Sequence, residues 1–259
     1  MRPGALGDGV RLATGTLTVL HVPAPRLVDR AAAAVAMTLA PVVGALLAGP
    51  AAAVGTLAVR AGAGDLVAAG LALTLLVATT GGLHLDGLAD TVDGLAAGRG
   101  DKARALEVMR RGDVGPLGAT ALVLVLLLQA AALARAMPAW GFGALPLASA
   151  AGRCVLPVLC TRGVPAARSG GLGAAVAGVV PRTLAVLVPV GVAGATLLVA
   201  MAAGAGDPWR AGAAVLAGCI AGSLFGWRAV HRVGGITGDL LGAGVEIGTT
   251  TALVVLALR

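Results

Sequence analysis

Long apolar runs dominate this chain and limit what it can fold into. Seven of them approach the roughly twenty residues that an α-helix needs to cross the hydrocarbon core of a bilayer. They occupy residues 31–49, 65–84, 117–134, 142–160, 183–203, 211–227 and 239–258. Only 12% of the 259 residues are charged, whereas soluble domains carry about 25%. The sequence therefore predicts an all-α, polytopic integral membrane protein with about seven transmembrane helices.

Ala, Gly, Val and Leu fill most of these runs, which suits close helix packing through small residues. The stretch 50–63 is apolar as well, which leaves an eighth or a re-entrant segment open as an alternative. No internal repeat and no separate soluble domain interrupts the pattern. We expect a single membrane-embedded domain over residues 1–259.

The distribution of basic residues predicts the orientation, because Lys and Arg concentrate in the cytoplasmic loops of membrane proteins. Fourteen of the 19 basic residues fall on the side of the N-terminus, four fall on the other side, and Arg153 lies within a span. The fourteen are Arg2, Arg11, Arg26, Arg30, Arg99, Lys102, Arg104, Arg110, Arg111, Arg162, Arg168, Arg182, Arg228 and Arg232. We expect a multi-pass cell-membrane protein whose N-terminus is cytoplasmic.

A formal charge of +7 raises the question of nucleic-acid binding, but no basic stripe interleaved with aromatic residues is present. Loop arginines orient a membrane protein instead. The three cysteines lie inside apolar segments, where cysteine behaves as a small hydrophobic residue, so neither a disulfide framework nor a zinc site is expected.

Three aspartates follow the second apolar run, in "GGLHLDGLADTVDGL" at residues 81–95. If this stretch is helical, Asp86, Asp90 and Asp93 share one face, where like charges repel. A hard cation such as Mg²⁺ would offset that repulsion and leave room for phosphate oxygens. The motif predicts a metal and phosphate site at the cytoplasmic face of the membrane, in the loop between the second and third spans.

Two other readings of these aspartates stay open. They could form a solvated polar helix end that complements a helix N-terminus. Alternatively, they could mark a proton or ion pathway, as intramembrane carboxylates often do. His84 lies two residues before Asp86. It could contact a phosphate or accept a proton, or it could be an ordinary interfacial histidine without a role in the site.

The segment "ALEVMRRGDVGPLG", residues 105–118, holds a second set of charges. Glu107 can pair with Arg110 or Arg111 at helical spacing, which is a solvated salt bridge in the simplest interpretation. Arginines at this depth also suit phosphate oxygens, because the guanidinium fork matches their geometry.

The third set lies in "GGITGDLLGAGVEIGTT", residues 234–250. Asp239 and Glu246 are seven residues apart on one helical face, which places Glu246 about 10 Å inside the seventh span by helix rise. A Gly-rich packing surface with incidental acids is the alternative. Arg153 lies within the fourth span and needs a partner or a polar cavity, and one of these carboxylates is the natural candidate.

Together with "LTVLHVPAP" before the first span, these motifs resemble the cobalamin synthase family, the membrane-embedded adenosylcobinamide-GDP ribazoletransferases, nearly end to end. The resemblance implies a magnesium-dependent transfer at the inner face of the membrane. A ribose hydroxyl of α-ribazole, or of its 5′-phosphate, attacks the cobinamide-bearing phosphorus of adenosylcobinamide-GDP. GMP leaves, and adenosylcobalamin or its 5′-phosphate forms.

The resemblance also suggests a role for each charged residue. It implies Asp86, Asp90 and Asp93 as the metal and diphosphate site, and Asp239 and Glu246 as further ligands or as the base. His84 joins them as a catalytic candidate. The candidates for substrate binding are Arg110, Arg111, Asp113 and Arg153. A second copy of the chain and other cobalamin-assembly enzymes are candidate partners.

Two rival functions can be weighed against this one. CDP-alcohol phosphotransferases of lipid synthesis also hold metal with an aspartate cluster, but "DGLADTVDGLAAGRG" does not fit their spacing. A carboxylate-lined transporter would need neither the Gly-rich turns nor motifs gathered on one face. Release of GMP would exclude the transporter.

Overall fold

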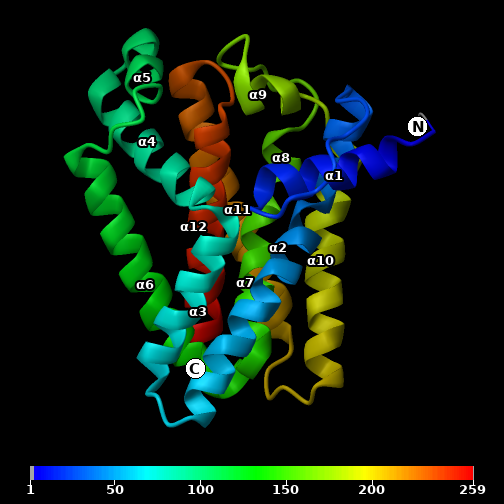
Figure 1. Ribbon diagram of the computed structural model, residues 1–259, viewed down its shortest axis with the longest axis vertical. Coiled ribbons are helices and arrows are strands. Elements are labelled where there is room, and N and C mark those ends of the chain that lie inside the picture. Colours follow the sequence, from blue (N-terminus) through cyan, green and yellow to red (C-terminus); the bar gives the residue numbers. More distant parts are fainter. Residues whose placement is uncertain (1–2, 259) are drawn as a thin grey trace.

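Helices form most of the computed structural model, which describes residues 3–258 (Figure 1). The long helices are α2 (Arg30–Arg60), α3 (Asp65–Thr80), α4 (Leu83–Gly98), α6 (Pro116–Trp140), α10 (Arg182–Ala202), α11 (Trp209–Val233) and α12 (Gly238–Ala257). The shorter ones are α1 (Ala5–Leu17), α5 (Lys102–Val108), η1 (Gly141–Gly143), α7 (Ala144–Arg153), α8 (Val155–Leu159) and α9 (Gly171–Val176). The described residues form no strand beyond two isolated bridges, so the all-α prediction is confirmed.

Five stretches are long and apolar enough to cross a membrane, within the described residues. They are Arg30–Arg60, Pro116–Leu159, Arg182–Ala202, Trp209–Val233 and Gly238–Ala257. The pair α3 and α4 gives a sixth if it is one broken span, bent by 86°. The multi-pass prediction is confirmed. Length and composition alone give five or six spans within the described residues, so the predicted number of about seven is not confirmed.

Two features explain the difference in span count. The span expected at 65–84 is helical only to Thr80, because the chain bends there into α4. The spans expected at 117–134 and 142–160 fall in the 44-residue stretch Pro116–Leu159, which counts once by length and composition although its helices α6 and α7 run in opposite directions (Figure 1). The apolar stretch 50–63 is no separate segment, since α2 runs unbroken to Arg60.

The segment after the second span is a second difference from prediction. It was expected to be a long loop, but it folds into α4 and α5. Asp101 caps α5 by accepting hydrogen bonds from the backbone N–H groups of Ala103 and Arg104, at 2.9 and 3.2 Å. The carboxylates of this region are therefore held on helices, which fixes their relative positions.

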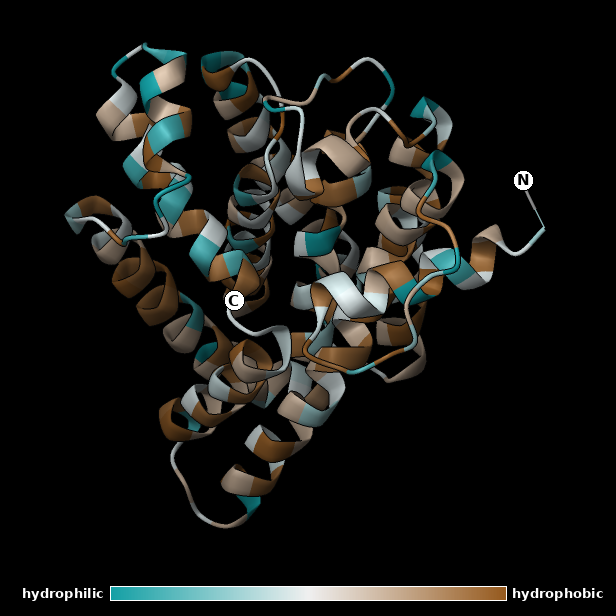
Figure 2. Ribbon diagram, turned by 45° about the horizontal axis from the view of Figure 1, so that its top comes forward, coloured by the Kyte–Doolittle hydropathy of each residue, from teal (hydrophilic) through white to brown (hydrophobic). Residues whose placement is uncertain are grey.

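Hydrophilic residues gather at the end of the bundle that carries α4 and α5, while long helices such as α6 are mainly apolar (Figure 2). The N-terminal helix and α9 lie at that same end, and the C-terminus lies at the other (Figure 1). The three charged motifs found in the sequence thus fall on one side of the molecule, as predicted.

Glycines let α12 pack closely at the centre of the bundle. A Cβ on Gly218 of α11 would lie 2.5 Å from the carbonyl oxygen of Gly248 on α12, and one on Gly222 would lie even closer to that of Gly244. Real Cβ atoms do not approach backbone so closely, so larger residues would force α11 and α12 apart. Membrane helices commonly achieve close approach in this way.

Candidate functional site

The site forms where α4 crosses α12, at a contact that only glycine permits. A Cβ on Gly87 of α4 would lie 2.7 Å from the carbonyl oxygen of Asp239. A Cβ on Gly242 of α12 would lie 3.1 Å from the Cα of His84. These two glycines therefore bring the first and third sequence motifs into direct contact.

Local backbone chemistry sets where both helices begin. Gly81 and Gly82 take φ values of 62° and 70°, which glycine adopts without a Cβ clash, and so allow the sharp bend between α3 and α4. The hydroxyl of Thr237 accepts a hydrogen bond from the Leu240 N–H at 3.2 Å and caps α12. As a result, His84 and Asp86 lie in the first turn of α4, and Asp239 lies in the first turn of α12.

A cavity of about 210 Å³ opens at this crossing. Four residues with charged or titratable side chains line it: His84, Asp86, Arg168 and Asp239. Seven apolar side chains and Thr237 also line it, together with five glycines, namely Gly170, Gly171, Gly173, Gly238 and Gly242. Exposed backbone and a mixed-charge lining suit a ligand with anionic oxygens and hydroxyl groups.

Arg168 is the cation of this cavity, and sequence reasoning placed it only among the orienting arginines. It comes from the loop between α8 and α9, and its Nη2 lies 2.9 Å from Oδ2 of Asp239. Both side chains keep about a quarter of their surface exposed, so the ion pair is accessible from the cavity. No motif surrounds Arg168, and only the fold brings it to Asp239.

The three aspartates of the first motif do not share one setting in the structure. Residues 83–98 are helical, which is the condition for a shared face, and Asp90 lies within electrostatic reach of Asp86 and Asp239. Asp93 has another partner, because its two carboxylate oxygens accept hydrogen bonds from the N–H groups of Gly115 and Gly118, at 2.7 and 2.9 Å. It thereby caps the start of α6, whose first N–H groups lack partners within the helix.

No group of three or more His, Cys, Asp or Glu residues within the described part of the chain is arranged to hold a metal ion. Mg²⁺ usually binds through one or two carboxylates together with substrate phosphates, so a complete protein cage is unnecessary. Asp86 and Asp90 supply oxygen ligands of the correct type, and the buried Asp90 is within electrostatic reach of three other carboxylates and of Arg168. The donor chemistry therefore fits Mg²⁺ held jointly with a phosphate ligand.

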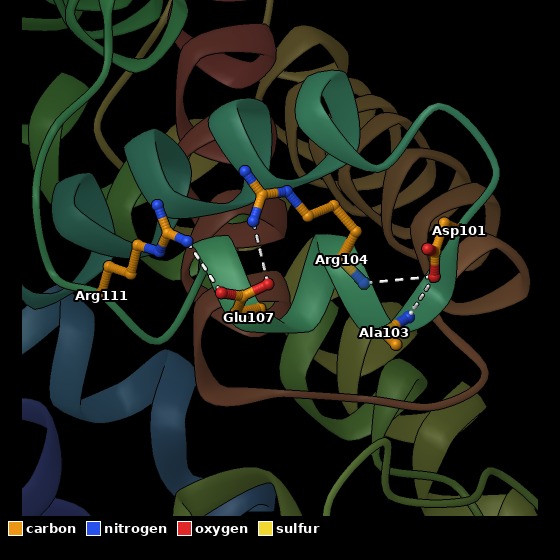
Figure 3. Close-up of polar contacts among 5 residues, drawn as sticks. All are labelled: Asp101, Ala103, Arg104, Glu107 and Arg111. Carbon is orange, nitrogen blue, oxygen red and sulfur yellow. Dashed lines mark hydrogen bonds and ion pairs between the residues drawn. The ribbon is translucent and has the colours of Figure 1, made fainter.

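The second charged motif lies outside the cavity. Glu107 accepts hydrogen bonds from Arg111 at 2.7 Å and from Arg104 at 2.9 Å, and the three side chains are about half exposed (Figure 3). The hydrogen bonds from Arg111 and Arg104 hold the pKa of the Glu107 carboxyl below its ordinary value. Arg110 and Asp113 are exposed, so none of the predicted binding residues Arg110, Arg111 and Asp113 lines the cavity.

Glu246 and Arg153 lie deeper in the bundle, around a second cavity of about 20 Å³. Gln129 donates a hydrogen bond to Glu246 at 2.8 Å, and Arg153 donates to the hydroxyl of Ser149 at 2.5 Å. His84 lines both cavities and separates them. Arg153 was predicted to pair with a carboxylate. Glu246 attracts it electrostatically, but the two side chains form no direct ion pair.

The inner cavity has a mixed apolar and polar lining, and it contains two buried nitrogen atoms without partners in the described part of the chain. Nε2 of His84 and Nε of Arg153 have no hydrogen-bond partner among the described residues. A volume of this size accommodates about one water molecule, which needs such polar partners. Glu246 faces this chamber and not the larger cavity, so its predicted role as a base lacks a direct path to the site.

Comparison with known proteins places these features in a family context. The protein-family model described as cobalamin-5-phosphate synthase matches residues 9–257. A protein of Nocardioides named adenosylcobinamide-GDP ribazoletransferase is 44% identical over 255 residues, covering 97% of this chain and 99% of the relative. A protein of the same name from Frankia casuarinae is 40% identical, covering 96% and 94%.

A further relative of that name, from Pseudomonas aeruginosa, is 42% identical over 201 residues and covers 76% of this chain and 77% of its own length. No solved structure matches. The family match spans all three charged motifs and the helices that carry them. The chain belongs to the cobalamin-5-phosphate synthase family.

Proposed function

We propose that this protein is an adenosylcobinamide-GDP ribazoletransferase that joins its substrate to α-ribazole or α-ribazole 5′-phosphate and releases GMP. Family membership and the names of its relatives support the activity. The proposed location of the active site rests on one observation, the crossing of α4 and α12. It places Asp86, Asp239 and Arg168 around one cavity.

The reaction requires charge neutralisation on a diphosphate and a positioned hydroxyl nucleophile. The ribose oxygen forms a bond to the cobinamide-bearing phosphorus, and the bond from that phosphorus to the GMP oxygen breaks. Arg168 binds the diphosphate oxygens, for which a guanidinium is well suited. Asp239 lines the cavity and accepts the hydroxyl proton, and its ion pair with Arg168 holds both groups in place.

The size of the cavity indicates which part of the substrate it takes. At about 210 Å³ it is smaller than the pockets that enclose drug-sized ligands, which start near 300 Å³. We assign it to the diphosphate and the attacking ribose. The corrinoid and the guanosine lie outside it, along the same end of the bundle.

In this proposal Asp86 and Asp90 would hold Mg²⁺ together with the diphosphate. A bound ion would supply Lewis-acid stabilisation of the phosphate charge. Asp86 lines the cavity, and Asp90 lies one turn further along the same face of α4. His84 contributes to orienting the phosphate, while Arg110 and Arg111 remain candidates for contacts with the parts outside the cavity.

The active end faces the cytoplasm in this account, with the N-terminus inside. Its support is the excess of basic residues on the side that carries the three motifs. Soluble adenosylcobinamide-GDP and ribazole would then reach the site without crossing the bilayer. Labelling of an Asp113→Cys variant with a membrane-impermeant thiol reagent tests this orientation. The cysteine should stay unlabelled in sealed cells and become labelled after the membrane is permeabilised.

Purified protein in lipid vesicles should release GMP and form a corrinoid product from adenosylcobinamide-GDP, α-ribazole and Mg²⁺. Chelation by EDTA should lower the rate at least about 100-fold, because a bound metal contributes several kcal/mol of transition-state stabilisation. Restored Mg²⁺ should recover the rate. Chromatography of both products measures the reaction.

Substrate controls distinguish the rival functions. Release of CMP from a CDP-alcohol by the same preparation, without corrinoid product, would favour a lipid phosphotransferase. Uptake of a solute without turnover would favour a transporter. An unchanged rate in EDTA would remove the magnesium proposal and leave the transferase activity standing.

A further inference from the structure

A groove of about 600 Å³ lies between α8, α10 and α11, and it shares no lining residue with the cavity of the proposed active site. Its α10 wall includes Ala185, Val186, Pro189 and Val190, whose spacing places them on one helical face. From Arg182 to Val190 this wall extends about 12 Å by helix rise. The groove thus follows α10 over more than two helical turns, and most of its lining is apolar.

The groove opens toward the lipid. Both α10 and α11 are among the helices long and apolar enough to cross a membrane. Val186 and Val190 on one wall are 61% and 54% exposed, and Ile220 on the other wall is 58% exposed. Exposed apolar side chains on two spanning helices face hydrocarbon, so an occupant of this groove must itself be apolar over most of its length.

Two arginines stand at one end of the groove. Arg162 precedes Gly163 in the loop after α8, and Arg182 is the first residue of α10. The loop is fixed there, because the Arg162 N–H donates to the Val180 carbonyl at 2.9 Å. A Cβ on Gly163 would lie 3.6 Å from Nη2 of Arg182, so the Arg182 guanidinium rests directly beside this loop.

These two charges lack compensation within the protein. Both side chains are exposed, and neither has a carboxylate partner within the described part of the chain. Neighbouring cations repel, and a cation at the first turn of a helix is opposed by the helix dipole. An anion bound between Arg162 and Arg182 would offset both the repulsion between the two cations and the unfavourable interaction of Arg182 with the helix dipole.

We propose that this groove binds one anionic phospholipid, with its phosphate between Arg162 and Arg182 and an acyl chain along α10 and α11. Basic pockets between membrane helices recognise lipid headgroups in this way. Trp227 lines the same groove, and tryptophan favours the level of the headgroups. The lipid would hold α10, which packs mainly on α11, against the rest of the bundle.

Fluorescence of Trp227 provides a local test. Trp140→Phe and Trp209→Phe leave Trp227 as the sole tryptophan of the full chain, since the sequence has three. In phosphatidylcholine vesicles, a small fraction of brominated phosphatidylglycerol should quench this residue far more than the same fraction of brominated phosphatidylcholine. The Arg162→Ala/Arg182→Ala variant should weaken this preference about 25-fold, because each basic residue near an anionic lipid contributes roughly five-fold.

Two matched controls distinguish binding in the groove from a general effect of lost positive charge or added side-chain volume. Arg228→Ala/Arg232→Ala removes the same charge from exposed positions on α11 outside the groove, and it should keep the preference. Ile220→Phe should reduce quenching by narrowing the groove. Leu224→Phe, at a residue 52% exposed and outside the groove, should not.

Three results would overturn the proposal. Equal quenching by the two brominated lipids in the wild-type background would show that no anionic lipid is selected. Relief of quenching by millimolar inorganic phosphate would identify a site for a free anion. Protection of Trp227 from both lipids, with crosslinking between two copies through α10, would show that a second chain fills the groove. None of these readouts depends on transferase activity.

Discussion

Replacing Asp86 with asparagine should lower kcat/KM for the transfer at least about 100-fold, because the change removes a charged ligand from a metal and diphosphate site. Asp86 lines the cavity beside Asp239 and Arg168, and asparagine preserves its size. Initial rates of GMP release over a range of Mg²⁺ concentrations measure the effect. A weakened metal site should also shift the half-maximal Mg²⁺ concentration upward.

A control with the same chemistry lies at the other end of the bundle. Asp65 is an exposed residue at the start of α3, and Asp65→Asn should leave the rate within about two-fold, as surface changes usually do. Equal rates for Asp86→Asn and the wild type would exclude Asp86 from the reaction.

The Gly87→Ala variant should lose both stability and activity although it adds a single methyl group. The new Cβ would meet the Asp239 backbone at 2.7 Å, so α4 must move away from α12. Overpacking of this kind costs about 1 to 3 kcal/mol in free energy of unfolding. Displacing Asp86 from Asp239 by about 1 Å should lower the rate about 100-fold. Thermal unfolding in detergent and GMP release measure the two effects.

Gly70→Ala is the matched control for this variant. Gly70 lies within α3, and a Cβ there would have no neighbour within 4 Å. Alanine favours the helix by up to about 1 kcal/mol over glycine, so this variant should match or exceed the wild-type stability. A Gly87→Ala protein with full activity and unchanged melting temperature would show that the helices do not need this contact.

The sequence was sufficient to predict the class of fold and the side on which the motifs gather. Apolar runs report membrane helices well because the bilayer sets their length. The spacing of Asp86, Asp90 and Asp93 showed that a helix here would place them on one face, and residues 83–98 are helical. Side-chain direction was harder to predict, since spacing cannot show that Asp93 turns to Gly115 and Gly118.

Residues distant in sequence account for what was missed. Arg168 lies 71 positions before Asp239 in a loop without a recognisable pattern, so only tertiary structure reveals the ion pair. Glu246 shares a helical face with Asp239 in sequence, yet it packs behind His84 against Gln129. The helix rise correctly placed it deep in the span, but it could not show which cavity it faces.

The bend between α3 and α4 was also beyond sequence reasoning. The pair "GG" at 81–82 stands inside an apolar run, so hydropathy alone predicts one span that continues through it to residue 84. Its two positive φ values end α3 at Thr80 and redirect the chain by 86°. Because of this redirection, His84 and Asp86 lie against α12 and do not continue along the line of α3.

The central claim is that the transfer takes place in the cavity at the crossing of α4 and α12, and a comparison of two arginines tests it most directly. Arg168 lines that cavity, whereas Arg110 is exposed outside it. In the GMP-release assay, Arg168→Gln should lower kcat/KM about 10- to 100-fold, the usual loss for a hydrogen bond to a charged group. Arg110→Gln removes at most a contact with the parts of the substrate outside the cavity, so it should lower kcat/KM by no more than a few-fold. A large loss for Arg110→Gln with full activity for Arg168→Gln would contradict the account.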